Sequence, residues 1–393
     1  MRKVGTIVRG IRTPIIKEND DLESIVVNSL LDASKDEGFE FYDKDVVAIT
    51  EAVVGISEGN FATLDDIALD IKNKLNSDHI GIVFPILSRN RFAVCLSAMA
   101  RSTKKLTLLL SYPSDEVGND ILYREDLRKN NVKVTDVITY EDYMAKFHSF
   151  VHPFTGVNMV DFYKELVEKE GCACDIILSN NPLDILKYTN DVISCDIHTR
   201  EETKALLKNN GANVISMADI LSSSVNGSGY NEKYGLLGSN RATEERVKLF
   251  PRTGQTLVEN VQRRLKEATG KNIEVMVYGD GAFKDPVGKI WELADPVVSP
   301  AYTSGLEGSP NELKLKYLSE NKFKDLSGDE LNNAIREEIK TKDSNLKGTM
   351  ASQGTTPRRY TDLIGSLCDL TSGSGDKGTP VVLVQRYFSN YSD

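Results

Sequence analysis

Between about residues 80 and 216, short apolar runs alternate with segments of helical periodicity, and this pattern restricts the possible folds more than any other. The runs of strand length are Ile80–Phe84, Leu106–Leu110, 132–137, Ile176–Leu178 and Asn213–Ile215. A helical segment opened by Ser88 runs from Arg91 to Met99, and another ends at Gly211 before the last strand. The alternation predicts a mainly parallel sheet with helices on its faces.

The flanking parts of the chain show the same two periodicities. Predicted strands lie at 3–8, at 46–50 with a continuation through Val53-Val54 to Gly55, at Ile273–Val277 and at Val381–Gln385. Predicted helices lie at about 22–33, at Leu64–Leu75 and at Leu257–Ala268. The first of them is capped by the acidic segment that begins at Asp20-Asp21. Residues 311–345 are highly charged and helical. The fold class expected for the whole chain is α/β.

Composition narrows the class of protein. Of 393 residues, 40% are hydrophobic and 27% charged, the balance of a globular protein, and the net charge is −10. This acidic excess argues against general binding to nucleic acid or to an anionic membrane. No apolar stretch is long enough for a membrane span, the first residues lack signal-peptide features, and five cysteines is an odd number. We therefore expect a cytoplasmic protein without a disulfide framework.

Three loops at the ends of apolar strands are candidates for ligand binding. They are Thr50–Asn60, Asp280–Pro286 and the glycine-rich Ser372–Pro380. Glycine allows backbone N–H groups to approach an anion, and a carboxylate such as Asp280 can hold a hard cation. None of the three has the spacing of a Walker A loop, and no dinucleotide-binding glycine motif opens a helix.

In their order along the chain, these loops resemble the coenzyme F420-0:L-glutamate ligase family. Five segments carry the resemblance. Near the N-terminus, Arg12–Leu22 is similar to the family's opening Gly-Leu-Pro-Leu-Ile…Gly-Asp-Asp-Leu, and Asp45–Gly59 is similar to its second strand and Ala-Glu-Gly turn. In the second half, Tyr234–Asn240 is similar to Ala-Gly-Ile-Asp-x-Ser-Asn, Asp280–Pro286 to Ser-Asp-Thr-Phe-Gly-Arg-Pro, and Gly373–Val384 to Gly-Gln-Ala-Asp-Glu-Gly-x-Pro-Val-Val-Leu-Ile. The resemblance covers residues 1–80 and 228–393, which we expect to form one α+β core, with 81–227 as an inserted α/β segment.

The resemblance implies a GTP-dependent ligase, with ATP as the other possible nucleotide, that activates a carboxylate as an acyl phosphate and joins it to the amine of L-glutamate. It also implies Mg²⁺ or Mn²⁺ and a homodimer. Asp280 is the predicted metal ligand. The predicted nucleotide-binding residues are Asn240, Thr50, Glu51, Gly373, Ser374, Gly375, Asp376, Lys377 and Gly378. No catalytic residue is predicted, and the acceptor is left open between F420-0, a folate and another small carboxylate.

Several positions depart from the family pattern. A metal-binding aspartate of the family falls on Leu237, its metal-binding glutamine on Ser374, and two nucleotide-contacting lysines on Ala52 and Ile56. Lys284, Lys377 and Arg358-Arg359 could supply the missing charge from new places. These departures support a second hypothesis, in which the chain is a binding protein derived from this family that has lost ligase activity.

A third hypothesis places the active site in the inserted segment. There Ser88-Arg89-Asn90-Arg91 follows a strand and could bind an anion at the start of a helix. A zinc site at Cys172, Cys174, Cys195 and His198 is the weaker interpretation of those residues, which we expect to be buried and reduced.

Overall fold

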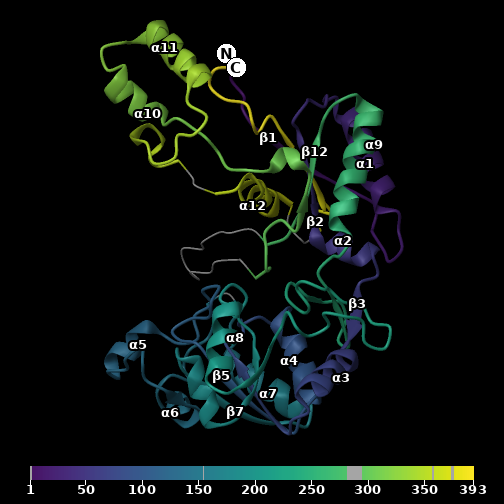
Figure 1. The fold of residues 1–393 in the computed structure, drawn as a ribbon, viewed down its shortest axis with the longest axis vertical. Helices are drawn as coiled ribbons and strands as arrows, with labels where there is room; N and C mark the ends of the chain where they lie inside the picture. The colour runs from purple at the N-terminus through teal and green to yellow at the C-terminus, as the bar shows by residue number, and fades with distance from the viewer. Residues whose placement is uncertain (1, 154, 281–293, 356–357, 373–375) are drawn as a thin grey trace.

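The computed structural model describes residues 2–153, 155–280, 294–355, 358–372 and 376–393. Its strands form a five-stranded sheet of order β1-β14-β2-β12-β13, a six-stranded sheet of order β6-β7-β5-β4-β8-β9 and a three-stranded sheet of order β10-β11-β3. Figure 1 shows the first two sheets in separate halves of the molecule, with the chain termini together at one end. The expected α/β class is confirmed.

The five-stranded sheet takes its strands from both ends of the chain. These strands are β1 (Ile7–Ile11), β2 (Val46–Thr50), β12 (Glu274–Tyr278), β13 (Ala301–Tyr302) and β14 (Val381–Gln385). Strand β12 runs parallel to β2, whereas β14 is antiparallel to both β1 and β2. The limits 1–80, 228–393 and 81–227 stay a prediction as domain boundaries.

Alternate residues of this sheet enter two different cores, as the two-residue period of a strand requires. Val47, Ile49 and Val275 pack on the face covered by α1 (Leu22–Glu37) and α9 (Gly254–Thr269). Val46, Ala48 and Met276 point to the other face and pack against α12 (Tyr360–Ser372). Both faces are therefore buried, which explains why β2 and β14 are continuously apolar.

The six-stranded sheet confirms the parallel sheet predicted from the alternation. Its parallel strands are β4 (His79–Val83), β5 (Lys105–Leu110), β7 (Ala173–Leu178), β8 (Asp191–Ser194) and β9 (Asn213–Ser216), and the edge strand β6 (Ile138–Thr139) is antiparallel to β7. Its helices are α3 (Leu64–Leu75), α4 (Phe92–Arg101), α5 (Arg124–Lys129), α6 (Tyr140–Lys146), α7 (Met159–Lys169), η1 (Pro182–Lys187) and α8 (Arg200–Asn209).

The hydrophobic core around this sheet reaches beyond the segment assigned to it from the sequence. It includes Leu64 and Ile67 of α3 and continues to Leu236, Leu249 and Phe250. The remaining strands, β3 (Phe61–Thr63), β10 (Asn240–Arg241) and β11 (Arg246–Lys248), pair in the small sheet that lies between the two larger ones. Residues on both sides of the predicted boundaries thus share one core.

Local signals explain where the main helices begin and end. The Asp21 carboxylate accepts the Ser24 N–H at 3.0 Å, and Gly38 ends α1 with a φ of 66°. Thr63 and Asp66 form a reciprocal capping box at the start of α3. The start of both helices and the end of α3 agree with the prediction, whereas α1 continues to Glu37, beyond its predicted end at about residue 33.

Two predicted strand segments are wrong, and the strand predicted at 3–8 is displaced, because β1 begins only at Ile7 and ends at Ile11. The residues after Thr50 form helix α2 (Glu51–Ser57), because Glu51, Val54 and Gly55 are buried at helical spacing. Residues 132–137 form turns, in which the Asp136 side chain accepts the Lys133 N–H at 2.9 Å and Val134 is exposed.

The charged segment 311–345 is helical as predicted. It contains α10 (Leu315–Tyr317), the π-helical turn η3 (Leu318–Lys322) and α11 (Gly328–Thr341), and two further short turns, η2 (Ser304–Leu306) and η4 (Met350–Ser352), flank it. In Figure 1, α10 and α11 project away from both large sheets. Within the residues described, no helix has the length and apolar character needed to cross a membrane.

All five cysteines are buried and free. Burial raises the pKa of the Cys172 thiol to about 11 and that of Cys174 to about 12, so both stay protonated at neutral pH. No group of three or more His, Cys, Asp or Glu side chains suited to a metal ion occurs in the part of the chain that the structure describes. The interpretation of these cysteines as buried thiols is therefore the one that fits.

Candidate functional site between the two large sheets

A cavity of about 1270 Å³ separates the two halves of the molecule. Its walls come from the carboxyl ends of β2 and β12, from the loop after β4, from the small sheet and from the segment that enters β14. Typical small-molecule sites enclose about 300–1,000 Å³. The cavity therefore has room for more than one small molecule.

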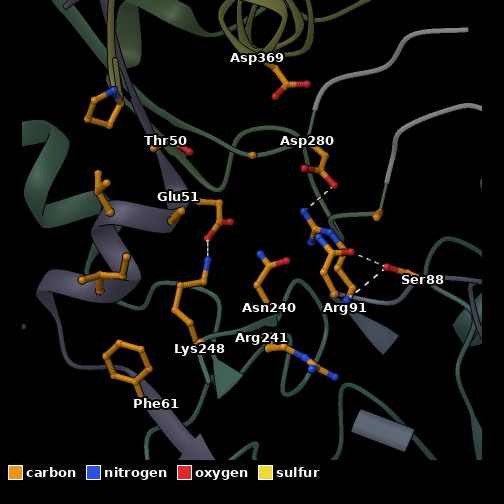
Figure 2. Close-up of a pocket in the computed structure, with 18 of the residues that line it drawn as sticks. Thr50, Glu51, Phe61, Ser88, Arg91, Asn240, Arg241, Lys248, Asp280 and Asp369 are labelled. Carbon is orange, nitrogen blue, oxygen red and sulfur yellow. Dashed lines mark hydrogen bonds and ion pairs between the residues drawn. The ribbon is translucent and has the colours of Figure 1, made fainter. Parts of the chain in front are cut away.

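The structure brings together predicted site residues that lie far apart in the sequence. Thr50, Glu51, Asn240, Asp280 and Gly378 all line this cavity. Figure 2 shows Asn240 between Glu51 and Arg91, with Asp280 above Arg91. Each of the five segments that carry the family resemblance thus contributes at least one residue to this cavity, the first of them through Ile16, Lys17 and Glu18.

Other predicted residues lie elsewhere or cannot be placed. Asp376 and Lys377 are exposed and do not line the cavity, and the Lys377 carbonyl accepts a hydrogen bond from Arg12 Nε at 3.3 Å. Gly373, Ser374, Gly375 and Lys284 lie outside the described residues.

Helix α2 places a buried ion pair in the cavity wall. Its first residue, Glu51, accepts a hydrogen bond from Lys248 Nζ of β11, and both side chains are 5% exposed. Burial raises the pKa of the Glu51 carboxyl, an effect opposed by Lys248 and reinforced by the nearby Asp295. The ion pair joins the five-stranded sheet to the small one.

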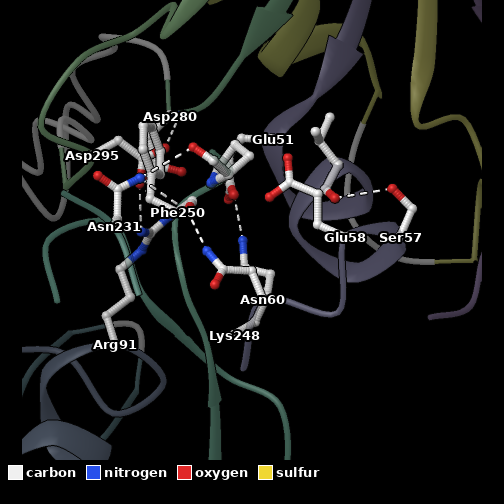
Figure 3. A network of polar contacts seen from close by, with 12 residues as sticks. Glu51, Ser57, Glu58, Asn60, Arg91, Asn231, Lys248, Phe250, Asp280 and Asp295 are labelled. Carbon is white, nitrogen blue, oxygen red and sulfur yellow. Dashed lines mark hydrogen bonds and ion pairs between the residues drawn. The ribbon is translucent and has the colours of Figure 1, made fainter. Parts of the chain in front are cut away.

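A second group of charges surrounds Arg91, directly before α4. Its guanidinium donates to Asp295 Oδ1 at 2.7 Å and forms an ion pair with Asp280 Oδ2, also at 2.7 Å. Burial alone would lower the pKa of Arg91, but Asp295 and then Asp280 raise it, so the guanidinium stays charged. Figure 3 shows Arg91 below Asp280 and Asp295, beside the Glu51–Lys248 pair.

The opposite wall is organised by a buried carboxylate. Asp115 accepts hydrogen bonds from the backbone N–H groups of Leu87, Val117 and Asn119 at 2.7–3.1 Å, and all three of these residues line the cavity. Burial raises the pKa of Asp115 to about 6.

Sequence reasoning singled out Arg91 but missed Asp295, Lys248 and Arg241. Asp295 and Lys248 stand in no recognisable motif, and only their tertiary contacts reveal them. Arg241 directly follows the predicted Asn240 and lines the cavity. Within the described residues, the side chains of Arg241 and Lys17 are cavity-lining cations with neither a hydrogen-bond nor an ion-pair partner.

The chain matches the family model of F420-0:gamma-glutamyl ligase over residues 10–386. It belongs to the F420-0:gamma-glutamyl ligase family. The matched range includes residues 81–227, for which the sequence motifs offered no counterpart. A comparison with curated proteins found no match.

Membership of the F420-0:gamma-glutamyl ligase family gives the cavity a chemical context. A gamma-glutamyl ligase must hold a carboxylate acceptor next to the amine of glutamate, and several motifs of the family line this one cavity. The residues present do not match a preformed metal centre, because Asp280 and Asp295 are already paired with the Arg91 guanidinium. Leu237, which replaces a metal-binding aspartate of the family pattern, is 1% exposed and packs in the hydrophobic core.

Proposed function

We propose that this protein is a nucleotide-dependent ligase that adds L-glutamate to a small carboxylate acceptor, with both substrates bound in the cavity between the large sheets. The observation that supports this most strongly is the convergence of Thr50, Glu51, Asn240, Asp280 and Gly378 on one cavity in a chain of this ligase family.

The proposed reaction has two steps. An acceptor carboxylate oxygen attacks the terminal phosphorus of GTP or ATP, so that an acyl phosphate forms and the nucleoside diphosphate leaves. The glutamate amine then attacks the acyl carbon, loses a proton and displaces inorganic phosphate as the amide bond forms. Mg²⁺ or Mn²⁺ would reduce the repulsion between the phosphates and the incoming carboxylate.

The free cations of the cavity are the proposed phosphate-binding groups. Arg241 and Lys17 line the cavity without a described ion-pair partner, whereas Arg91 and Lys248 are each bonded to carboxylates. A guanidinium such as that of Arg241 can bind two phosphate oxygens at once. These residues would take over the role of the family lysines that fall on Ala52 and Ile56.

A thermal-shift titration tests nucleotide binding directly. GTP or ATP with Mg²⁺ or Mn²⁺ should raise the melting temperature, because a ligand that binds only the native state stabilises it. Arg241→Gln should reduce the apparent nucleotide affinity about tenfold or more, since one charge-assisted contact is lost. Arg263→Gln is the matched control, because Arg263 pairs with Glu267 on the surface of α9. An equal nucleotide response in both variants would contradict this assignment.

Ligation itself requires a product assay. Candidate acceptors, including F420-0 and folates, are incubated with nucleotide and L-glutamate, and mass spectrometry detects the glutamylated product. The second candidate function, a binding protein that has lost catalysis, rests on the replacement of charged family residues by Leu237, Ala52 and Ile56. It predicts saturable nucleotide or acceptor binding with neither product nor nucleoside diphosphate formed.

A further inference from the structure

Arg91 connects the two halves of the molecule through carboxylates of the opposite half. It precedes α4 in the six-stranded part, whereas Asp280 and Asp295 belong to the segment after β12 of the five-stranded sheet. The Arg91 side chain is 14% exposed and that of Asp295 only 1%. The Asp280 side chain is 20% exposed, so the Arg91–Asp295 pair is the more deeply buried of the two, and removing one partner of a buried charge pair is costly.

The two carboxylates are also fixed relative to each other. The Asp280 N–H donates to Asp295 Oδ2 at 2.7 Å. Gly279 allows this approach, because a Cβ atom there would lie 2.0 Å from Asp295 Oδ2 and 3.4 Å from Glu51 Cγ. Three carboxylates, those of Glu51, Asp280 and Asp295, therefore gather around the cations of Arg91 and Lys248.

A metal ion and a guanidinium would use the same carboxylate oxygens. Asp280 Oδ2 forms an ion pair with Arg91, Asp295 Oδ1 accepts a hydrogen bond from Arg91, and Asp295 Oδ2 accepts one from the Asp280 N–H. A hard divalent ion requires direct oxygen ligands at about 2.0–2.6 Å, which the Arg91 guanidinium would obstruct. The arrangement is a partly neutralised cluster, in which two cations face three carboxylates, and no group of side chains suited to a metal ion occurs among the described residues.

We propose that Arg91 is the resident cation of the Asp280–Asp295 pair, so that the protein alone binds no divalent ion there and any such ion arrives with a ligand. Arg91 is thus a positioning residue that holds both carboxylates in place. This inference does not depend on ligase activity and can be tested without nucleotide or acceptor.

The test is a Mn²⁺ titration of the full chain by calorimetry, in the absence of nucleotide. The wild-type protein should show no saturable binding up to about 1 mM Mn²⁺, the range of weak protein sites. Arg91→Gln removes the positive charge and should create a Mn²⁺ site at least about tenfold tighter. Adding Asp280→Asn to Arg91→Gln should abolish that gain.

Arg101→Gln is the matched control. Arg101 is the last residue of α4, the helix that Arg91 precedes. Its guanidinium forms ion pairs with three carboxylates, those of Asp65, Glu170 and Glu245, at 2.6–3.2 Å. An equal gain in Arg101→Gln, or no gain in a folded Arg91→Gln, would overturn the proposal. If Arg91→Gln does not fold, the wild type is compared with Asp280→Asn. Saturable Mn²⁺ binding by the wild type that Asp280→Asn abolishes would also overturn the proposal. Absence of Mn²⁺ binding in both proteins would support it.

Discussion

The contribution of the Glu51–Lys248 ion pair to stability depends more on the burial of its two charges than on the attraction between them. Both side chains are 5% exposed, so neither charge is compensated by water. Breaking a buried pair by removing one partner destabilises proteins by about 3–5 kcal/mol, whereas replacing both partners is often close to neutral.

We therefore expect Lys248→Met to lower the free energy of unfolding by about 3 kcal/mol, because Glu51 would be left without its partner. The double variant Glu51→Gln/Lys248→Met should recover most of this loss. Urea unfolding of the three proteins measures both values. Equal stability of the single and double variants would show that the pair is not the cause.

Asp115 should make stability depend on pH in the acidic range. Its folded-state pKa of about 6 lies above the value of 3.8 expected without burial. The folded state therefore holds a proton more tightly than the unfolded state, and this contribution to stability is complete below pH 3.8 and lost as the pH rises through 6.

Asp115→Asn should remove that dependence, because an amide does not titrate. Between about pH 4 and 6.5, the unfolding free energy of the wild type should fall relative to that of the variant by up to about 3 kcal/mol. Chemical denaturation at several pH values measures the difference. The variant also loses acceptor capacity for the N–H groups of the cavity wall, so the slope with pH is the relevant quantity and not the absolute stability. A constant difference across this range would contradict the expectation.

At the scale of elements, helix α2 is held close to the segment after β11. A Cβ atom on Gly55 would lie 2.8 Å from the Leu249 carbonyl oxygen, which is too short for a real contact. The close approach lets Glu51 of the same helix reach Lys248.

Gly55→Ala should therefore cost about 1–3 kcal/mol, despite the higher helix propensity of alanine, because backbone atoms have to move. It should also weaken binding of whatever ligand fills the cavity. Gly5→Ala is the control, since nothing lies within 4 Å of a Cβ atom at that position. Thermal unfolding of both variants provides the comparison, and equal midpoints would argue against a tight contact.

Most elements of the fold could be predicted from sequence because their apolar pattern has one physical cause. Strands β4, β5, β12 and β14 are buried on both faces and read as continuous apolar runs. Helix α2 was mistaken for a strand because Val53-Val54 favours strands locally, whereas its tertiary contacts favour a helix.

The candidate site was only partly predictable for a related reason. Thr50, Asn240, Asp280 and Gly378 stand in motifs, and their convergence follows from the strand ends that carry them. The ion pairs of Asp295 with Arg91 and of Lys248 with Glu51 each join residues that are more than 190 positions apart in the sequence. No local pattern records such a pairing.

For the whole molecule, assembly is the main open prediction. The family resemblance implies a homodimer with the ligand site near its interface. Light scattering at micromolar protein concentration should therefore give twice the mass of the chain. A monomer would contradict the prediction and weaken the transfer of the family's site to this chain.

The position of β14 has a consequence for synthesis on the ribosome. This strand lies between β1 and β2, although it follows them by nearly the whole length of the chain. Until residues 381–385 leave the ribosomal exit tunnel, β1 and β2 have no partner between them, and β2 exposes an unpaired apolar edge. The six-stranded sheet, whose strands all lie between residues 79 and 216, can be complete long before then. The nascent chain thus carries one finished half while the other awaits its last strand, and during that interval it is a natural client for a chaperone that shields strand edges.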